Sequence, residues 1–274
     1  MPVEILSSKP GWLDVLIQRA TRADGQPPFS DGSLVELATA KRELLVIGDV
    51  AAALLGDGEA EFVVDPDARR HGHGTELLEE LLSSSPGLRV WAHGDHKAAR
   101  ALAASHGLEA VRELLQLRLA LDPRGFRQAQ SANSTVASFR RGIDETAWLE
   151  LNARAFASHP EQGRVTRADL DVLMAEPWFD ADDFLVLRDG DAITGYCWLK
   201  VEHGIGEFYV VGVSPERQGE GLGRRLVEAG LSRLAERGIR ISSLYVEADN
   251  QAAVRLYRSF GFDDHSVDIQ YAKA

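Results

Sequence analysis

Residues 211–224 read Val-Gly-Val-Ser-Pro-Glu-Arg-Gln-Gly-Glu-Gly-Leu-Gly-Arg, and this stretch decides the fold. An apolar strand stops at Pro215, and a glycine-rich turn then opens a helix. Glycines let the backbone approach a bulky anion closely. The free N–H groups and the dipole at the start of a helix favour a phosphate. The stretch therefore predicts a pyrophosphate site, to which Arg217 and Arg224 could add positive charge.

The position of this loop separates it from a dinucleotide-binding fold. Such a fold has Gly-x-Gly-x-x-Gly after its first strand and an acidic residue about 20 residues later. Here the loop follows the fourth strand of its unit, and the spacing is Gln-x-x-Gly-x-Gly from Gln218. Taken alone, the loop could also be a glycine turn that only packs a helix on a sheet.

The chain contains an internal repeat of this stretch. Residues 61–74 read Glu-Phe-Val-Val-Asp-Pro-Asp-Ala-Arg-Arg-His-Gly-His-Gly, and they align with residues 210–223 at an offset of 149. In both copies an apolar strand runs into a proline turn, a basic residue, a Gly-x-Gly and an amphipathic helix. A strand and a short helix follow in each copy, now at an offset of 154, with the helices expected at 96–106 and 250–260.

The repeat predicts two domains. Residues 122–134 are polar, lack periodicity and contain Pro and Gly, which is linker composition. We therefore expect domains at 1–130 and 131–274. The second copy reads as α+β, and we expect two tandem domains, each a mixed, mostly antiparallel sheet flanked by helices. Its expected elements are strands at 136–140, 184–188, 192–201 and 207–213 and helices at 144–156, with Asp144 as N-cap, and 218–237.

A second motif, Asn250-x-x-Ala253-x-x-x-Tyr257-x-x-x-Gly261-Phe262, lies downstream of the loop. The two motifs in this order resemble those of the GNAT family of acetyltransferases. The resemblance implies that acetyl-CoA is the co-substrate and that the strand before the loop splays from its neighbour at a bulge. The pantetheine arm would lie along that strand, and the diphosphate on the loop. The implied contacts are Val211, Gly212, Val213, Gln218, Gly219, Glu220, Gly221, Leu222, Gly223, Arg224, Asn250, Gln251, Ala252, Ala253, Val254 and Arg255.

Acetyl transfer to an amine needs a neutral nitrogen, a stabilised oxyanion and a proton for the departing thiolate. Glu207, four residues before Val211, is the candidate base, acting directly or through water. Tyr257 is the candidate acid, because a phenol of pKa about 10 can protonate a thiolate of pKa about 8.5. A backbone N–H of residues 211–213 could serve the oxyanion. The structural alternatives are an exposed glutamate at a strand end and a tyrosine packed in the core.

The first copy keeps the loop and lacks these proton-transfer groups. Aligned through Gly107 and Gly261, the position of Tyr257 is Ala103. Aligned through the prolines, the position of Glu207 is Gly58. We therefore expect a non-catalytic N-terminal domain that still binds acetyl-CoA, with contacts at Phe62, Val63, Val64, Arg70, His71, Gly72, His73, Gly74 and Thr75.

The acceptor pocket is expected beside residues 152–163, which read Asn-Ala-Arg-Ala-Phe-Ala-Ser-His-Pro-Glu-Gln-Gly. This run, Trp198-Leu199-Lys200 and residues 244–250 are similar to those of tandem GNAT members that acetylate the cysteinyl amine of a cysteine–glucosamine–inositol conjugate. The acceptor contacts that this likeness implies are Glu36, Glu161, Lys200, Glu207 and Tyr245. Without it, Glu36 reads as solvated surface, Lys200 as a strand-end lysine and Tyr245 as a core aromatic. Another small amine, a protein N-terminus, and a non-catalytic acetyl-CoA-binding regulatory module remain open alternatives.

The composition bounds the partners and the compartment. A formal net charge of −12 disfavours nucleic acid and anionic lipid, because both are polyanions. Cys197 is the only cysteine, which fits a reducing compartment, and it reads as buried filler. We expect no secretory leader, membrane span or metal site. The expectation is a cytoplasmic monomer that acts on a small amine.

Overall fold

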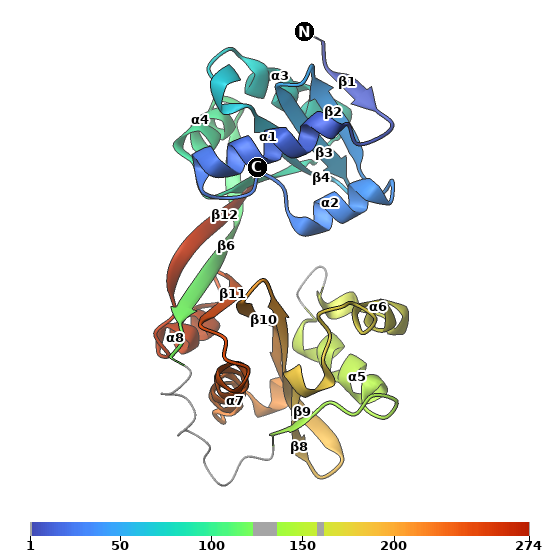
Figure 1. Cartoon of the computed structure of the whole chain (residues 1–274), viewed down its shortest axis with the longest axis vertical. Coiled ribbons are helices and arrows are strands. Elements are labelled where there is room, and N and C mark those ends of the chain that lie inside the picture. The colour runs from blue at the N-terminus through green and yellow to red at the C-terminus, as the bar shows by residue number, and fades with distance from the viewer. Residues whose placement is uncertain (1, 123–135, 158–161, 274) are drawn as a thin grey trace. The chain divides into compact units, whose positions relative to one another are not determined.

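The computed structural model describes residues 2–122, 136–157 and 162–273 (Figure 1). The chain forms two compact units. The first comprises residues up to 116 together with 247–249 and 265–274, and the second comprises 117–246 and 250–264. Each unit therefore contains a strand segment from the other half of the chain. The boundary expected near residue 130 lies outside the described residues.

The first unit is a mixed sheet with helices on both faces, in the strand order β1-β2-β3-β4-β5-β12-β6. From β1 to β4, neighbouring strands are antiparallel, whereas β4 and β5 are parallel. Its strands are β1 (Glu4–Leu6), β2 (Glu43–Ile47), β3 (Ala51–Gly56), β4 (Glu59–Val64), β5 (Arg89–His93) and the first part of β6 (Leu108–Ala120). Its helices are α1 (Gly11–Asp24), α2 (Asp31–Ala38), α3 (His73–Ser84) and α4 (Lys97–Ser105).

Strand β2 shows why this sheet is covered on both faces. Successive side chains of a strand point to opposite faces. Leu44 and Val46 pack in the core that contains Leu13 of α1, whereas Leu45 and Ile47 pack in the core with α3. All four are at most 2% exposed, so the continuous apolar run of β2 fits a strand buried on both sides.

The last strand of the chain, β12 (Asp263–Lys273), completes the sheet of the first unit. It runs antiparallel to β5, with Asp268 opposite His93 and Ala272 opposite Arg89. The end of β6 belongs to the second unit, where the Leu121 N–H donates to the Arg240 carbonyl at 2.8 Å. The two units are therefore not two consecutive segments of the chain, although the sequence repeat suggested that they would be.

The second unit has the strand order β6-β11-β10-β9-β8-β7. Neighbours from β7 to β10 are antiparallel, while β10 and β11 are parallel. Its strands are β7 (Val136–Ser138), β8 (Phe184–Asp189), β9 (Ala192–Glu202), β10 (Ile205–Val213) and β11 (Ile241–Glu247). Its helices are α5 (Glu145–Ala155), α6 (Arg167–Leu173), α7 (Leu222–Glu236) and α8 (Gln251–Arg258). The expected α+β class and the hairpin of β8 and β9 are confirmed.

An aromatic core lies between the sheet of this unit and α5. The Trp148 ring of α5 meets the rings of Phe184, Tyr196 and Trp198 at centroid distances of 5.5 to 5.9 Å. On the other face α7 approaches β10 so closely that a Cβ at Gly230 would lie 2.5 Å from the Phe208 ring. The two faces of β10 therefore meet different surroundings.

One local expectation was wrong. Helix α7 begins at Leu222 instead of residue 218, because Pro215–Arg217 form a 3-10 turn and Gly219 and Gly221 have φ of 86° and 79°. Asp144 is the N-cap residue of α5, as expected, but its side chain makes no capping bond. Its carboxylate instead binds the guanidinium groups of Arg140 and Arg188.

Among the helices of the described residues, none is both long and apolar enough to cross a membrane. Within the same part of the chain, His, Cys, Asp and Glu side chains form no group of three or more that could hold a metal ion.

Candidate active site

Strand β10 opens away from β11 part-way along its length. The parallel pairing runs from Ile205 opposite Ile241 to Phe208 opposite Leu244 and ends there. The register between β10 and β9 shifts between Phe208 and Val210, so Tyr209 is an additional residue in β10. The bulge and the splay that the sequence resemblance implied are therefore confirmed. The backbone of Val211–Val213 lies beyond the paired part of β10 and β11.

The glycine loop continues directly from this opened strand. The left-handed backbone at Gly219 and Gly221 is a conformation that side chains with a Cβ rarely adopt. Gly221 is the N-cap of α7 and makes no side-chain cap bond, so the first turn of α7 retains backbone donors for an anion. Arg217 donates to Glu220 and Asp189 at 2.7 and 3.0 Å, and its charge is therefore partly used within the chain.

Asn250 has a structural role at the start of α8. Its side-chain Oδ1 accepts the Ala253 N–H at 3.1 Å, as an N-cap does. Arg224, in the first turn of α7, donates to the Ser259 hydroxyl at 2.8 Å and lies over the Phe260 ring at 4.9 Å. The two sequence motifs are thus connected through the first turn of α7 and the end of α8.

Tyr257 lies in the core on the α7 side of β10. It is 8% exposed, and its ring centroid is 6.5 Å from that of Phe208 and 5.9 Å from that of Phe262. Burial raises the pKa of Tyr257 far above its usual value, and the Cys197 thiol adds to this effect. The phenol is therefore neutral before the reaction, as a general acid must be, while the raised pKa makes it a weaker proton donor. Cys197 itself is fully buried, and burial raises its thiol pKa, which fits a core residue.

Glu207 faces the opposite side of β10. It precedes Phe208, and alternate residues of a strand point to opposite faces. The side chain of Glu207 is half-buried. In the antiparallel pair of β10 and β9, Glu207 is opposite Lys200 of β9. Burial raises the pKa of the nearby Tyr209, the Lys200 charge lowers it and the Glu207 charge raises it, so these three side chains act on one another.

The other residues expected at the acceptor site have different surroundings. The Lys200 ammonium lies 2.9 Å from Glu202 Oε2. Tyr245 on β11 is 46% exposed, so it is not the core aromatic of the alternative interpretation. Glu36 lies on α2 of the first unit, where its carboxylate accepts from Arg42 Nε at 2.6 Å. Glu161 and His159 lie outside the described residues.

A buried hydrogen-bond network, which was not expected from the sequence, joins Asn152 and Gln162 of the acceptor segment. Asn152 of α5 is fully buried; its Nδ2 donates to the Gln162 carbonyl at 2.6 Å, and its Oδ1 accepts from Gln162 Nε2 at 3.1 Å. The Tyr196 hydroxyl donates to the same Oδ1 at 2.6 Å. One signal could have found it: Asn152 follows Trp148 by four residues and so shares the apolar face of α5.

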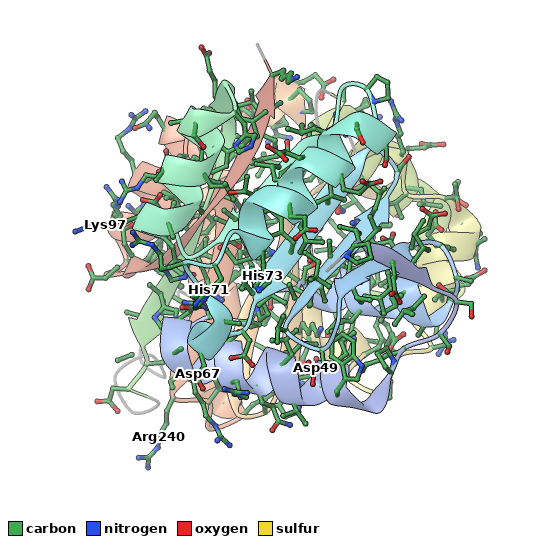
Figure 2. The ribbon with its side chains drawn as sticks, turned by 90° about the horizontal axis from the view of Figure 1, so that it is seen from above. Asp49, Asp67, His71, His73, Lys97 and Arg240 are labelled. Carbon is green, nitrogen blue, oxygen red and sulfur yellow. The ribbon has the colours of Figure 1, made fainter. Side chains whose placement is uncertain are left out.

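The loop of the first unit has the same backbone course as that of the second. Pro66–Ala68 form a 3-10 turn, and Gly72 is the N-cap of α3 with φ of 91°. Arg70 adopts φ of 67°, the left-handed conformation that Gly219 has in the second copy. Figure 2 shows His71 and His73 beside the start of α3. Their ring centroids are 6.5 Å apart.

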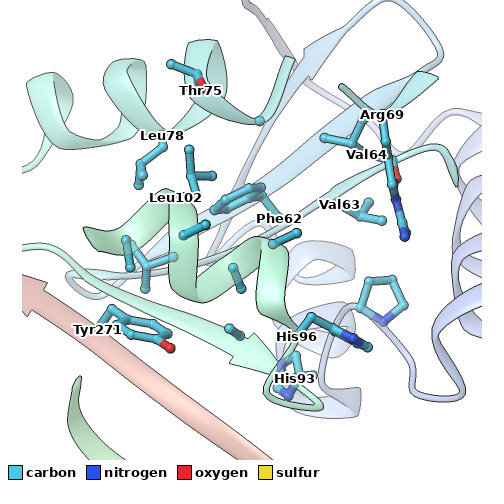
Figure 3. A pocket seen from close by; sticks show the side chains of 18 of the residues that line it. Phe62, Val63, Val64, Arg69, Thr75, Leu78, His93, His96, Leu102 and Tyr271 are labelled. Carbon is cyan, nitrogen blue, oxygen red and sulfur yellow. Dashed lines mark hydrogen bonds between the residues drawn. The ribbon is translucent and has the colours of Figure 1, made fainter. Parts of the chain in front are cut away.

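A pocket of about 890 Å³ adjoins this loop (Figure 3). Phe62 and Val64 of β4, Thr75 and Leu78 of α3 and Leu102 of α4 line it. The parallel pairing of β4 with β5 ends at Glu61 opposite Trp91, so these two strands also open beyond that point. The first unit thus has the same combination of opened strands and glycine loop.

The structure corrects one step of the sequence alignment between the copies. In β10, Glu207 is opposite Ser243 of β11. In β4, it is Glu59 that is opposite Arg89 of β5, and Arg89 precedes Ser243 by the repeat offset of 154. The position that corresponds to Glu207 is therefore Glu59, whereas the sequence comparison assigned Gly58. The bulge causes the error, because it adds one residue to β10, while β4 pairs with β3 in a continuous register.

Three donors surround Glu59. Its carboxylate accepts from Gln270 Nε2 at 2.9 Å, Trp91 Nε1 at 3.1 Å and Arg89 Nε at 3.2 Å. Arg89 and Trp91 belong to β5 and Gln270 to β12, so all three donors come from the first unit. The first unit therefore retains a carboxylate at the position of Glu207, but this carboxylate is engaged by donors of the same unit.

A largely buried His93, 14% exposed, lies at the edge of the same pocket, between two carboxylates. Its Nδ1 is 3.0 Å from Asp268 Oδ2 on β12, and its Nε2 is 3.5 Å from Glu61 Oε1. Burial lowers the pKa of His93, but hydrogen bonds and charges of the two carboxylates outweigh it and raise the pKa to about 9. Glu61 also accepts from the hydroxyls of Ser30 and Ser33, each at 2.9 Å.

Comparison with known proteins gives the family. Residues 146–262 match the family model described as "Acetyltransferase (GNAT) family". A mycothiol acetyltransferase of Clavibacter michiganensis is 47% identical over 93% of this chain and 89% of its own length. One of Thermomonospora curvata is 46% identical over 93% of this chain and 91% of its own. The chain belongs to the GNAT acetyltransferase family.

Solved structures agree on the fold of this GNAT acetyltransferase. A GCN5-related N-acetyltransferase from Sphaerobacter thermophilus matches with a TM-score of 0.74 and 24% identity, over 98% of this chain and 95% of that one. A tandem GNAT protein from the clavulanic acid biosynthesis pathway matches with a TM-score of 0.71 and 16% identity, over 98% of each chain. The family uses acetyl-CoA as acetyl donor. The opened β10 and the left-handed glycines of its loop fit a pantetheine arm and a diphosphate, respectively.

Proposed function

We propose that this GNAT acetyltransferase is a mycothiol synthase, which acetylates the cysteinyl amine of a cysteine–glucosamine–inositol conjugate and releases CoA. The observation that carries the proposal is the identity of 43 to 47% to mycothiol acetyltransferases over nearly the whole chain. Identity of this extent along both units supports a shared acceptor as well as a shared fold.

Within this proposal the second unit is catalytic and the first is not. The half-buried Glu207 accepts the proton of the amine, directly or through a water molecule. The buried Tyr257 phenol, whose pKa is raised, donates a proton to the leaving thiolate. A backbone N–H in Val211–Val213 stabilises the oxyanion. Lys200, Tyr245 and Glu207, together with Glu161, contact the acceptor.

The acetyl-CoA contacts follow the opened strand, the loop and the start of α8. They comprise Val211–Val213, Gln218–Arg224 and Asn250–Arg255. The first unit binds a second acetyl-CoA along Phe62–Val64 and Arg70–Thr75, which line or adjoin its pocket. Two features support its lack of catalysis: Ala103 stands at the position of Tyr257, and three donors engage Glu59.

An acceptor comparison tests this proposal. The purified chain and acetyl-CoA are incubated with the desacetylated conjugate, with glucosamine, and with a peptide bearing a free N-terminus. Free CoA is quantified by chromatography, because the conjugate carries its own thiol. We expect kcat/KM for the conjugate to exceed that for either alternative by at least about a hundredfold. Equal or greater turnover of the peptide or of glucosamine would refute the acceptor assignment.

A further inference from the structure

Tyr209 owes its direction to the bulge in β10. The preceding Phe208 points toward α7, whereas Tyr209 and Val210 both pack in the aromatic cluster on the other face. Two consecutive residues therefore share one face, which a regular strand does not allow. Bulges occur next to active sites, where they re-aim a side chain. Strand β4 of the first unit has a continuous register with β3, so the non-catalytic copy has no corresponding residue.

Trp178, which lies in a turn after α6, contacts Tyr209. The Phe179 N–H donates to the Glu176 carbonyl at 3.0 Å, which closes a turn around Pro177 and Trp178. The half-buried Trp178 ring lies 5.3 Å from the Tyr209 ring. Both rings rest on the fully buried Trp198, each at 5.7 Å between centroids. The core therefore fixes this pair of partly exposed aromatic rings.

The pair lies beside the charged residues of the candidate active site. The Lys200 ammonium is 5.4 Å from the centroid of the Trp178 ring, a cation–π contact that holds the cation. Tyr209 lies within electrostatic reach of Lys200 and Glu207. One surface thus offers apolar ring faces, a phenol and an ammonium. This combination suits a ring with one C–H face and several hydroxyl groups, because the apolar and polar groups of such a ligand lie close together.

We propose that Trp178 and Tyr209 bind the hydroxylated ring portion of the acceptor. The aromatic pair packs against the C–H face of a sugar or cyclitol ring, and the Tyr209 hydroxyl and the Lys200 ammonium bond its hydroxyl groups. The inference rests on the proposed function, since it takes a ring-bearing amine as the acceptor. It adds two specificity residues that touch the part of the acceptor remote from the transferred acetyl group.

Three variants of the full chain test this assignment. Trp178→Leu removes the ring face, and Tyr209→Phe removes only the hydroxyl. Phe179→Leu is the matched control, because its ring packs edge-on against Trp198 at 5.8 Å but makes no cation–π contact with Lys200 among the described contacts. The measurements are KM for the conjugate, KM for acetyl-CoA, the midpoint of thermal unfolding and calorimetric binding of the conjugate in the presence of saturating CoA.

We expect Trp178→Leu and Tyr209→Phe each to raise KM and Kd for the conjugate about threefold to tenfold. KM for acetyl-CoA should change less than twofold in both, and Phe179→Leu should leave the ratio of the two KM values unchanged. A merely structural role would shift both KM values together with the unfolding midpoint. Unchanged Kd and KM for the conjugate in both variants would overturn the inference. Failure of the unmodified chain to turn over the conjugate would refute the proposed function instead, and the calorimetric comparison would still report on the surface.

Discussion

Replacing Tyr257 by Phe separates the catalytic role of the residue from its packing role. The Tyr257 ring fills a space bounded by the rings of Phe208 and Phe262, and a phenylalanine ring fits the same space. Loss of the hydroxyl should therefore change the free energy of unfolding by no more than about 1 kcal/mol. Loss of a general acid should lower kcat by about 10²- to 10⁴-fold, which corresponds to about 3–5 kcal/mol in the activation free energy.

The pH dependence adds a second criterion. Burial raises the pKa of Tyr257, so the neutral phenol, which is the acid form, persists as the pH rises through the usual tyrosine range. The kcat of the unmodified chain should therefore not decline through ionisation of Tyr257 below about pH 10. The assay is the rate of CoA formation at saturating substrates from pH 6 to 10, with the unfolding midpoint as the control for folding. A Tyr257→Phe variant that folds normally and keeps kcat within about threefold would refute the assignment of this residue as the acid.

Three other outcomes follow from the structure. Gly212→Ala places a Cβ 2.5 Å from the Tyr196 ring, so KM for acetyl-CoA should rise about tenfold or more as the strand shifts; an unchanged KM would contradict the role of this strand. Gly72→Val forces a β-branched residue into φ of 91°, and calorimetry should then give one acetyl-CoA per chain instead of two; a stoichiometry that stays at two would place the additional site elsewhere. The pKa of about 9 at His93 lies above its ordinary value, so the histidine stabilises the fold by up to about 3 kcal/mol below pH 6.5, and this contribution is lost as the pH rises to 9 and beyond. Urea unfolding of the unmodified chain and of His93→Gln should therefore converge at high pH, and a constant difference between them would contradict the ion-pair account.

The sequence alone was sufficient to predict features that are formed by residues close together in the chain. The proline turn, the glycine loop and the amphipathic helix after it lie within residues 211–236 and were all expected from local chemistry, although the helix begins at Leu222 and not at residue 218. Of the four residues that share a helical face by spacing, Leu222, Leu226 and Leu234 are buried in α7 and Ala229 is half-buried. The internal repeat, the family and the hairpin of β8 and β9 could be inferred for the same reason.

Only the tertiary structure decided the features that depend on pairing between distant residues. A bulge is a property of two strands, so neither the additional residue Tyr209 nor the match of Glu59 to Glu207 follows from a constant offset in one chain. The pairing of β12 with β5 joins residues more than 170 positions apart, as in the bond from the Gly94 N–H to Asp268. Trp178 and Tyr209 come together only when a turn and a bulge meet over Trp198. The sequence of the glycine loop is enough to predict an anion-binding turn, because the residues that form it are neighbours in the chain. The side chains around an acceptor come from separate strands and turns, and only the folded sheet brings them together.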